Sequence, residues 1–325
     1  MFLLLAFACV EPPQRDNEDD QPAGNVSAET APSAAQPDAA PLELPDPPDQ
    51  ALPSVAEGVE LLEAGATPRE ALRFAPAEGQ VERLSARMAM SVSVSGAGIP
   101  PMSQRTPPVE QHSRVELVAL EPDQLRTKIV FEALEQAQGT PAGARTTAML
   151  ASARALEGFE QTRSFSRRGG LIDGSLDAPP GADPKLDKSL RTLGVNIAAT
   201  LIELPSEAIG VGAKWRQSAR FSSNGLAIER TTEAELLGRE GKKLLIGLRV
   251  SEQTTTTKFE REGTPGEVEV ARFDSRGSGL LSYELDKLLP ARARLRLDTE
   301  LSFTLSTSED PSRTVDTQVE LELDL

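Results

Sequence analysis

The stretch ARARLRLDTELSFTL, residues 291–305, decides the fold class, because apolar and polar side chains alternate along it. A period of two places successive side chains on opposite faces of a β-strand. A second alternating stretch, VDTQVELELDL, covers residues 315–325. The loop between them, Thr307–Ser312, is polar and contains a proline, which is typical of a turn. The two stretches predict one long antiparallel hairpin with a single apolar face.

The charges on the polar face of this hairpin favour one strand register. Pairing Arg294 with Asp324 and Arg296 with Glu322 sets opposite charges across from each other, whereas a shift of two residues opposes acidic residues. We therefore expect the first register. Each exposed pair is worth only roughly a few tenths of a kcal/mol, so burial of the apolar face determines which side faces the core.

The same alternation extends through most of the chain. Arg87–Val94, Val115–Ala119 and Leu125–Leu134 predict strands, the last two joined by a turn at 121–123. Asn224-Gly225 predicts a tight hairpin, and a further turn is expected at 239–241. The alternating positions on either side of that turn are Ile228, Arg230, Thr232, Ala234, Leu236, Leu244, Ile246, Leu248 and Val250.

Three segments have the spacing of an amphipathic helix. They are Val55–Ala64, Met149–Leu156 and Asp183–Ile202, the last with an N-cap at its first residue and Pro205 beyond its end. We expect a β-rich α+β domain. Its centre is a large curved, mostly antiparallel sheet or half-barrel, against which one or two helices pack.

Two short stretches share the pattern Phe-x-x-Arg-Gly. They are Phe165–Gly169 and Phe273–Gly277, and each precedes a short run that contains leucine. Both predict a strand, a glycine-containing turn and a returning strand. The repetition fits either an internal duplication or a chance similarity between two hairpin turns.

The only cysteine, Cys9, ends a short apolar run that begins at Met1. This segment resembles the lipobox of bacterial lipoproteins, in which diacylglycerol alkylates the thiol. The resemblance implies that residues 1–9 are a lipoprotein signal peptide and that Cys9 is the lipid attachment site. A non-lipidated secretory signal is the alternative. Both interpretations imply export.

The composition of residues 10–54 predicts that this segment is a disordered tether. Between Glu11 and Pro53 there are ten acidic residues and one basic residue, so this segment carries −9 of the formal net charge of −16. It also holds ten of the 25 prolines. Such a composition cannot offset the entropy lost on ordering, and the segment should span about 35–40 Å. Residues 55–325 remain as one β-rich globular domain.

Composition excludes several classes of function. The acidic balance disfavours nucleic acid, which requires clustered basic residues. The single histidine, His112, is expected in an ordinary loop and cannot supply a two-histidine metal site. Because no catalytic motif occurs, we expect no enzyme, no cofactor and no metal. The loop carboxylates Asp173, Asp177, Asp183 and Asp187 should be solvated, with calcium ligation as the alternative.

Aromatic residues make up only 4% of the chain, with one tryptophan and one tyrosine. Sugar-binding surfaces and protein-binding hot spots depend on these residue types, so a lectin-like role is disfavoured. We expect Trp215 to fill the core where the long helix meets the sheet.

Four segments of the domain resemble a family of uncharacterised bacterial lipoproteins. They are Leu72-Arg73-Phe74 with Gly79, then Leu204-Pro205, then Val211-Gly212-Ala213-Lys214-Trp215, and then the Arg276-Gly277 turn expected before the last strands. The resemblance implies a β-rich domain similar to the half-barrel of periplasmic lipoprotein carriers of the LolA and LolB type, and it implies no known activity. It also implies retention at the inner membrane when aspartate follows the cysteine. The residue here is Val10, which predicts the outer membrane.

These observations predict a lipid-anchored cell-envelope lipoprotein with a non-catalytic binding or assembly role. Its expected contacts are the membrane, through the anchor at Cys9, and another envelope protein. The alternative is a carrier that binds a lipid or another apolar ligand in the concave face of the sheet.

Overall fold

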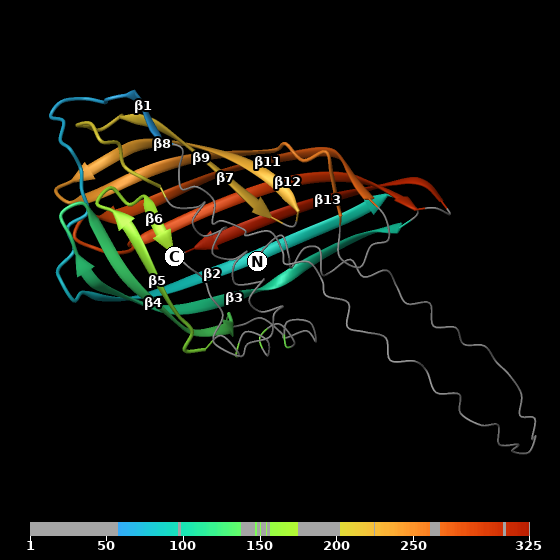
Figure 1. The fold of residues 1–325 in the computed structure, drawn as a ribbon, viewed down its shortest axis with the longest axis horizontal. Coiled ribbons are helices and arrows are strands. Elements are labelled where there is room, and N and C mark those ends of the chain that lie inside the picture. The colour runs from blue at the N-terminus through green and yellow to red at the C-terminus, as the bar shows by residue number, and fades with distance from the viewer. Residues whose placement is uncertain are drawn as a thin grey trace, which may run out of the picture.

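A computed structural model describes residues 58–96, 99–137, 147, 150, 154, 157–174, 202–223, 225–260, 267–307 and 310–324. The strands in these ranges form one 13-stranded sheet (Figure 1). They are β1 (Val59–Glu63), β2 (Val81–Gly96), β3 (Ile99–Leu120), β4 (Gln124–Gln136), β5 (Glu160–Ser166), β6 (Leu171–Gly174), β7 (Lys214–Ser223), β8 (Leu226–Glu240), β9 (Lys243–Thr254), β10 (Lys258–Glu260), β11 (Glu267–Glu284), β12 (Arg292–Thr307) and β13 (Asp310–Asp324).

The sheet consists of two antiparallel meanders joined side by side. Strands β2 to β6 are neighbours in chain order, and so are β7, β8, β9, β11, β12 and β13, with β10 paired to β11. The two meanders meet where β13 pairs with β2. Strand β1 precedes both meanders in sequence but pairs with β7 at the far edge. The two ends of the sheet are therefore β1 and β6.

The C-terminal hairpin has the predicted register. Arg294 lies opposite Asp324 and Arg296 lies opposite Glu322. The same register sets Asp298 opposite Glu320, and Asp298 forms an ion pair with Arg296 of its own strand at 3.2 Å. Within β12, the apolar residues face the core and the three arginines at 292, 294 and 296 are exposed. The predicted register is confirmed, and so is the predicted apolar face of β12.

The sheet curls until opposite parts of its inner face pack together (Figure 1). One cluster, here called the Trp215 cluster, joins Trp215 of β7 to Leu117 of β3 and Leu125 of β4. A second, the Phe303 cluster, joins Phe303 of β12 to Met90 of β2 and further residues of β7 and β8. Strands that are distant in the sheet order thus share a core at each end. The predicted curved, mostly antiparallel sheet is confirmed.

The packing helices are the part of the fold prediction that the structure does not support. Within Val55–Ala64, the described residues include β1, an edge strand paired with β7. Val59 and Leu61 pack against the Trp215 cluster. The edge of β7 offers backbone partners to an extended segment, and a helix this short is unstable alone. Asp183–Ile202 lies outside the described residues except for Ile202, and Met149–Leu156 except for Leu150 and Arg154.

The two Phe-x-x-Arg-Gly stretches have different structures. Phe165–Gly169 leads from β5 into the turn before β6, as predicted. Phe273–Gly277 lies inside the continuous strand β11, so the predicted turn there is wrong. A Cβ at Gly277 would overlap the carbonyl oxygen of Arg296 on β12. This glycine therefore permits close strand approach, and the structure lends no support to a duplication.

Candidate functional site

The chain segments that precede β2 and β7 meet at one end of the sheet. Glu70 and Ile209 exchange two backbone hydrogen bonds of 3.0 Å, which hold the chain before β2 against the chain before β7. A Cβ on Gly210 would overlap the carbonyl oxygen of Ala66. Five of the residues given above for the lipoprotein resemblance are buried in the Trp215 cluster: Leu72, Phe74, Leu204, Ala213 and Trp215. These residues close one end of the core, which is a structural role.

Arginines hold the same end together by bonding to the backbone. Arg73 donates from Nη2 to the carbonyl oxygen of Ser206 at 2.9 Å, and Arg167 donates from Nε to that of Phe74 at 2.6 Å. Arg168 forms a 2.6 Å ion pair with Glu203, which is largely buried. Arg167 and Arg168 lie in the predicted turn of Phe165–Gly169, and their side chains bind the closing segments.

The predicted site residues do not converge. Cys9 lies outside the described residues, as do Asp177, Asp183 and Asp187, while Asp173 lies in β6. His112 lies within β3, not in a loop, and its Nδ1 is 3.3 Å from the hydroxyl of Ser85 on β2. Strand β3 continues through the two prolines that precede His112. No metal-holding group of histidine, cysteine or carboxylate side chains occurs in the described part of the chain.

Trp215 and Tyr283 both fill the core. Trp215 is fully buried, as predicted, although the helix it was expected to meet lies outside the described residues. Tyr283 packs edge-on against Phe74, with ring centroids 5.5 Å apart. Burial raises the pKa of Tyr283 to about 12. Neither ring is available to bind a ligand at the surface.

A row of polar side chains crosses the inner face between the two apolar clusters. It runs over four adjacent strands and consists of Arg230, Glu252, Ser275 and Thr299, each opposite the next. All four are buried. Arg230 donates from Nε to Glu252 at 2.7 Å, and a second guanidinium nitrogen bonds to the same carboxylate oxygen. Ser275 and Thr299 share a 2.9 Å hydrogen bond. Every member of this row therefore has a partner within it.

Arg163 on β5 is an inner-face polar residue that has no ion-pair partner among the described residues. Its side chain points the same way as Phe165, which packs against the Trp215 cluster. Arg163 is 3% exposed, and among the described residues its guanidinium makes one hydrogen bond, from Nε to the side-chain carbonyl of Gln161 at 3.0 Å. Burial lowers the pKa of Arg163 to about 10. No carboxylate of the described residues forms an ion pair with it.

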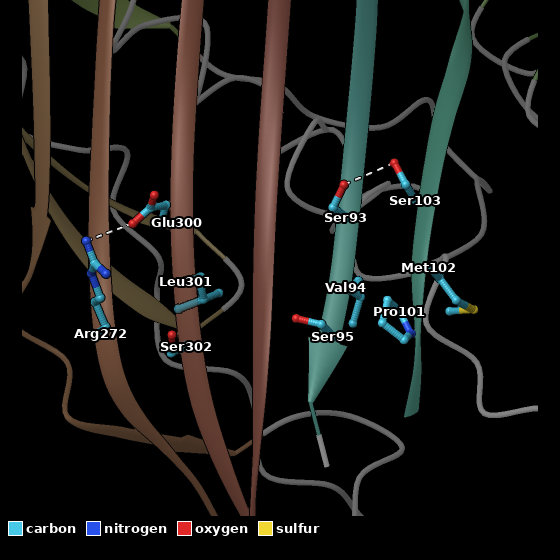
Figure 2. A pocket seen from close by; sticks show the side chains of 10 residues that line it. All are labelled: Ser93, Val94, Ser95, Pro101, Met102, Ser103, Arg272, Glu300, Leu301 and Ser302. Atoms are coloured by element: carbon cyan, nitrogen blue, oxygen red, sulfur yellow. Dashed lines mark hydrogen bonds and ion pairs between the residues drawn. The ribbon is translucent and has the colours of Figure 1, made fainter. Parts of the chain in front are cut away.

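A pocket of about 480 Å³ opens on the outer face, across β11, β12, β2 and β3. Figure 2 shows two pairs among its polar side chains: Arg272 forms an ion pair with Glu300 at 2.7 Å, and Ser93 donates a hydrogen bond to Ser103 at 3.0 Å. Because the two charged residues of the lining are paired with each other, the pocket has no strong preference for a charged ligand.

Exposed leucines form a small apolar area elsewhere on the outer face. The side chain of Leu237 on β8 lies over Gly247 of β9, and Leu280 of β11 lies opposite that glycine. Leu237 and Leu280 are 44% and 49% exposed. The area spans three adjacent strands.

Comparison with protein-family models and with curated proteins finds no match for this chain. In the described ranges, no helix has both the length and the apolar character needed to cross a bilayer.

The inner face of the curled sheet is therefore the strongest candidate site. It combines two apolar clusters with a buried polar row and an unmatched arginine. The sequence contained a signal for Arg230, which occupies an apolar-face position in its alternating strand. It contained none for Arg163, because the residues before Phe165 on that face are polar.

Proposed function

We propose that this chain is a lipid-anchored cell-envelope protein that binds an apolar or amphipathic ligand on the inner face of its curled sheet. It is non-catalytic in this proposal. The domain is held by a lipid on Cys9 and kept away from the membrane by the acidic tether of residues 10–54. Of the two roles expected from the sequence, the form of the sheet favours the carrier over an assembly role.

The observation that carries this proposal is the concave face itself. A sheet that curls without pairing its two edge strands, β1 and β6, can change its internal width by moving those edges. Its inner face presents large apolar side chains at both ends. Several inner-face residues between the clusters are only half-buried, among them Leu295, Leu297 and Ile129. Partly exposed aliphatic side chains on a concave surface are typical of sites for apolar ligands.

Native mass spectrometry of gently purified protein tests the proposal. We expect additional masses that correspond to a bound lipid or other apolar molecule and that disappear after extraction with organic solvent. Purification of the Cys9→Ser variant separates a bound ligand from the covalent anchor, because only the bound molecule remains in that variant. If the wild type shows only the mass of its covalently lipidated chain and Cys9→Ser shows only the mass of the polypeptide, the carrier role is contradicted.

Binding of another envelope protein is the second candidate, favoured by the exposed leucines around Gly247. Replacing Leu237 and Leu280 with serine would reduce such binding and leave the inner face intact. A carrier retains its bound apolar ligand in this double variant. A protein that functions through the leucine area instead loses partner binding, and neither the wild type nor the variant carries a ligand.

A further inference from the structure

Arg163 is held on the inner face by the strand that carries it. Strand β5 pairs with β4, and Arg163 lies directly opposite Thr127. Thr127 is also buried, and its hydroxyl bonds to the backbone carbonyl oxygen of Arg163 at 3.4 Å. One step along the same face, Gln161 lies opposite Ile129, and both are half-buried. The guanidinium thus lies between the Trp215 cluster and a more open stretch of the inner face.

The hydrogen bonding of Arg163 is incomplete. A guanidinium has five N–H donors, and the bond from Nε to Gln161 uses one of them. The other buried arginine of the inner face, Arg230, binds Glu252 and also lies over the ring of Phe221, 5.0 Å from its centroid. Buried charges in proteins are ordinarily paired in this way. Among the described residues, none supplies an anion to Arg163.

An unpaired buried cation is costly in an empty protein, and an anion delivered by a ligand removes that cost. The planar guanidinium fits a carboxylate or a phosphate with two parallel hydrogen bonds. The adjacent inner-face side chains, Phe165 and Ile129, suit an alkyl chain that extends from such a head group. A ligand that suits both the guanidinium and these apolar side chains is charged at one end and apolar along the rest of its length.

We propose that Arg163 binds the anionic head group of a single-chain amphiphile whose alkyl chain lies against the apolar inner face. This inference rests on the proposed carrier function and specifies its ligand class. Carboxylate and phosphate share the required chemistry, so the head group is either that of a fatty acid or that of a phosphate-bearing lipid.

Isothermal titration calorimetry with the purified, delipidated full-length chain tests the proposal. The probes have the same alkyl chain: laurate, dodecyl phosphate and uncharged dodecanol. We expect one or both anions to bind at least about tenfold more tightly than dodecanol, the gain typical of a hydrogen bond to a charged group. The tighter of the two anions identifies the head group.

The Arg163→Met variant should bind the anions no more tightly than dodecanol, and Arg163→Lys should keep part of the preference. Arg126→Met is the matched control, because Arg126 is a β4 neighbour on the exposed outer face, and it should bind as the wild type does. Arg163→Met should also unfold at equal or higher denaturant concentration, because it removes an unpaired buried charge.

The possible failures are distinguishable. If dodecanol binds as tightly as the anions, or if Arg163→Met keeps the anion preference, the role of Arg163 is wrong and the carrier function stands. If none of the three amphiphiles binds, both the carrier function and the inference are overturned.

Discussion

The buried arginines of the inner face differ in their expected roles: one stabilises the fold, and in our proposal the other binds the ligand. Arg230 and Glu252 form a matched buried pair, whereas Arg163 is buried without an anion. Two arginines on the same face of one sheet thus have opposite expected responses to removal of their charge. The matched pair stabilises the folded structure, whereas in our proposal Arg163 binds the ligand.

The first prediction concerns the buried pair. Glu252→Leu leaves Arg230 buried without its carboxylate and should lower the free energy of unfolding by about 3–5 kcal/mol. The double variant Arg230→Met/Glu252→Leu should recover most of that loss, because no uncompensated charge remains. Urea denaturation measures both. The exposed pair Arg220–Glu229 is the control, and Glu229→Leu should cost less than about 1 kcal/mol. A double variant as unstable as Glu252→Leu would contradict this account.

The second prediction concerns Tyr283. Its folded pKa of about 12 lies above the ordinary value of about 10, since burial disfavours the phenolate. A raised pKa contributes stability that is fully present below about pH 10 and is lost as the pH rises toward 12. We expect the wild type to lose stability over this window relative to Tyr283→Phe. The chain has one tyrosine, so ultraviolet absorbance reports its ionisation directly. Phenolate formation near pH 10 in the folded protein would refute the buried position.

At the scale of elements, period-two alternation predicted the strands well. Met88 to Val94 in β2 and the apolar residues of β12 up to Phe303 have the predicted faces, and the β12–β13 hairpin has the predicted register. Prediction failed where tertiary context outweighed local pattern. The segment at Val59 forms an edge strand because β7 offers partners, and Gly277 lies inside a strand because Leu297 packs close to it. Arg163 could not be predicted, since no local signal states which face of a polar segment is buried.

The third prediction tests the junction of the two meanders. Deleting residues 321–325 removes partners of both β12 and β2, including those of Leu297 and Met90. The loss should approach the whole stability of a domain, about 5–15 kcal/mol, so we expect no cooperative thermal transition. Arg296→Gln in the full-length chain removes a charge without removing backbone pairs and should change stability by less than about 1 kcal/mol. A truncated chain that melts like the full-length protein would exclude this role for β13.

The fourth prediction tests the closed end of the sheet. Gly210→Ala introduces a Cβ that overlaps the backbone of Ala66, and it should lower the free energy of unfolding by about 1–3 kcal/mol, as overpacking does. Gly238→Ala is the control, because its Cβ would meet only Leu245 at an ordinary 3.9 Å. That variant should stay within about 0.5 kcal/mol of the wild type. Equal denaturant midpoints for both variants would show that the two segments separate easily.

At the scale of the whole molecule, the proposed anchor and tether determine where the domain acts. Cys9→Ser should release the protein from the membrane into the soluble fraction after cell lysis. Val10→Asp keeps the cysteine and should move the protein from the outer to the inner membrane, as the lipoprotein resemblance implies. Density-gradient fractionation and immunoblotting measure both variants. Retention of Cys9→Ser in the membrane fraction would rule out the lipid anchor.

The pairing of β13 with β2 has a consequence for how the chain acquires its structure. The two strands lie near opposite ends of the domain sequence, yet they are hydrogen-bonded neighbours. Contacts of such long sequence separation form slowly, because loop closure must precede them. During synthesis, the edge of β2 that pairs with β13 stays unpaired until β13 emerges, and a bare strand edge invites aggregation. The nascent chain therefore cannot complete its sheet early. In the proposed export, this delay would keep the chain unfolded while it passes through a secretion channel.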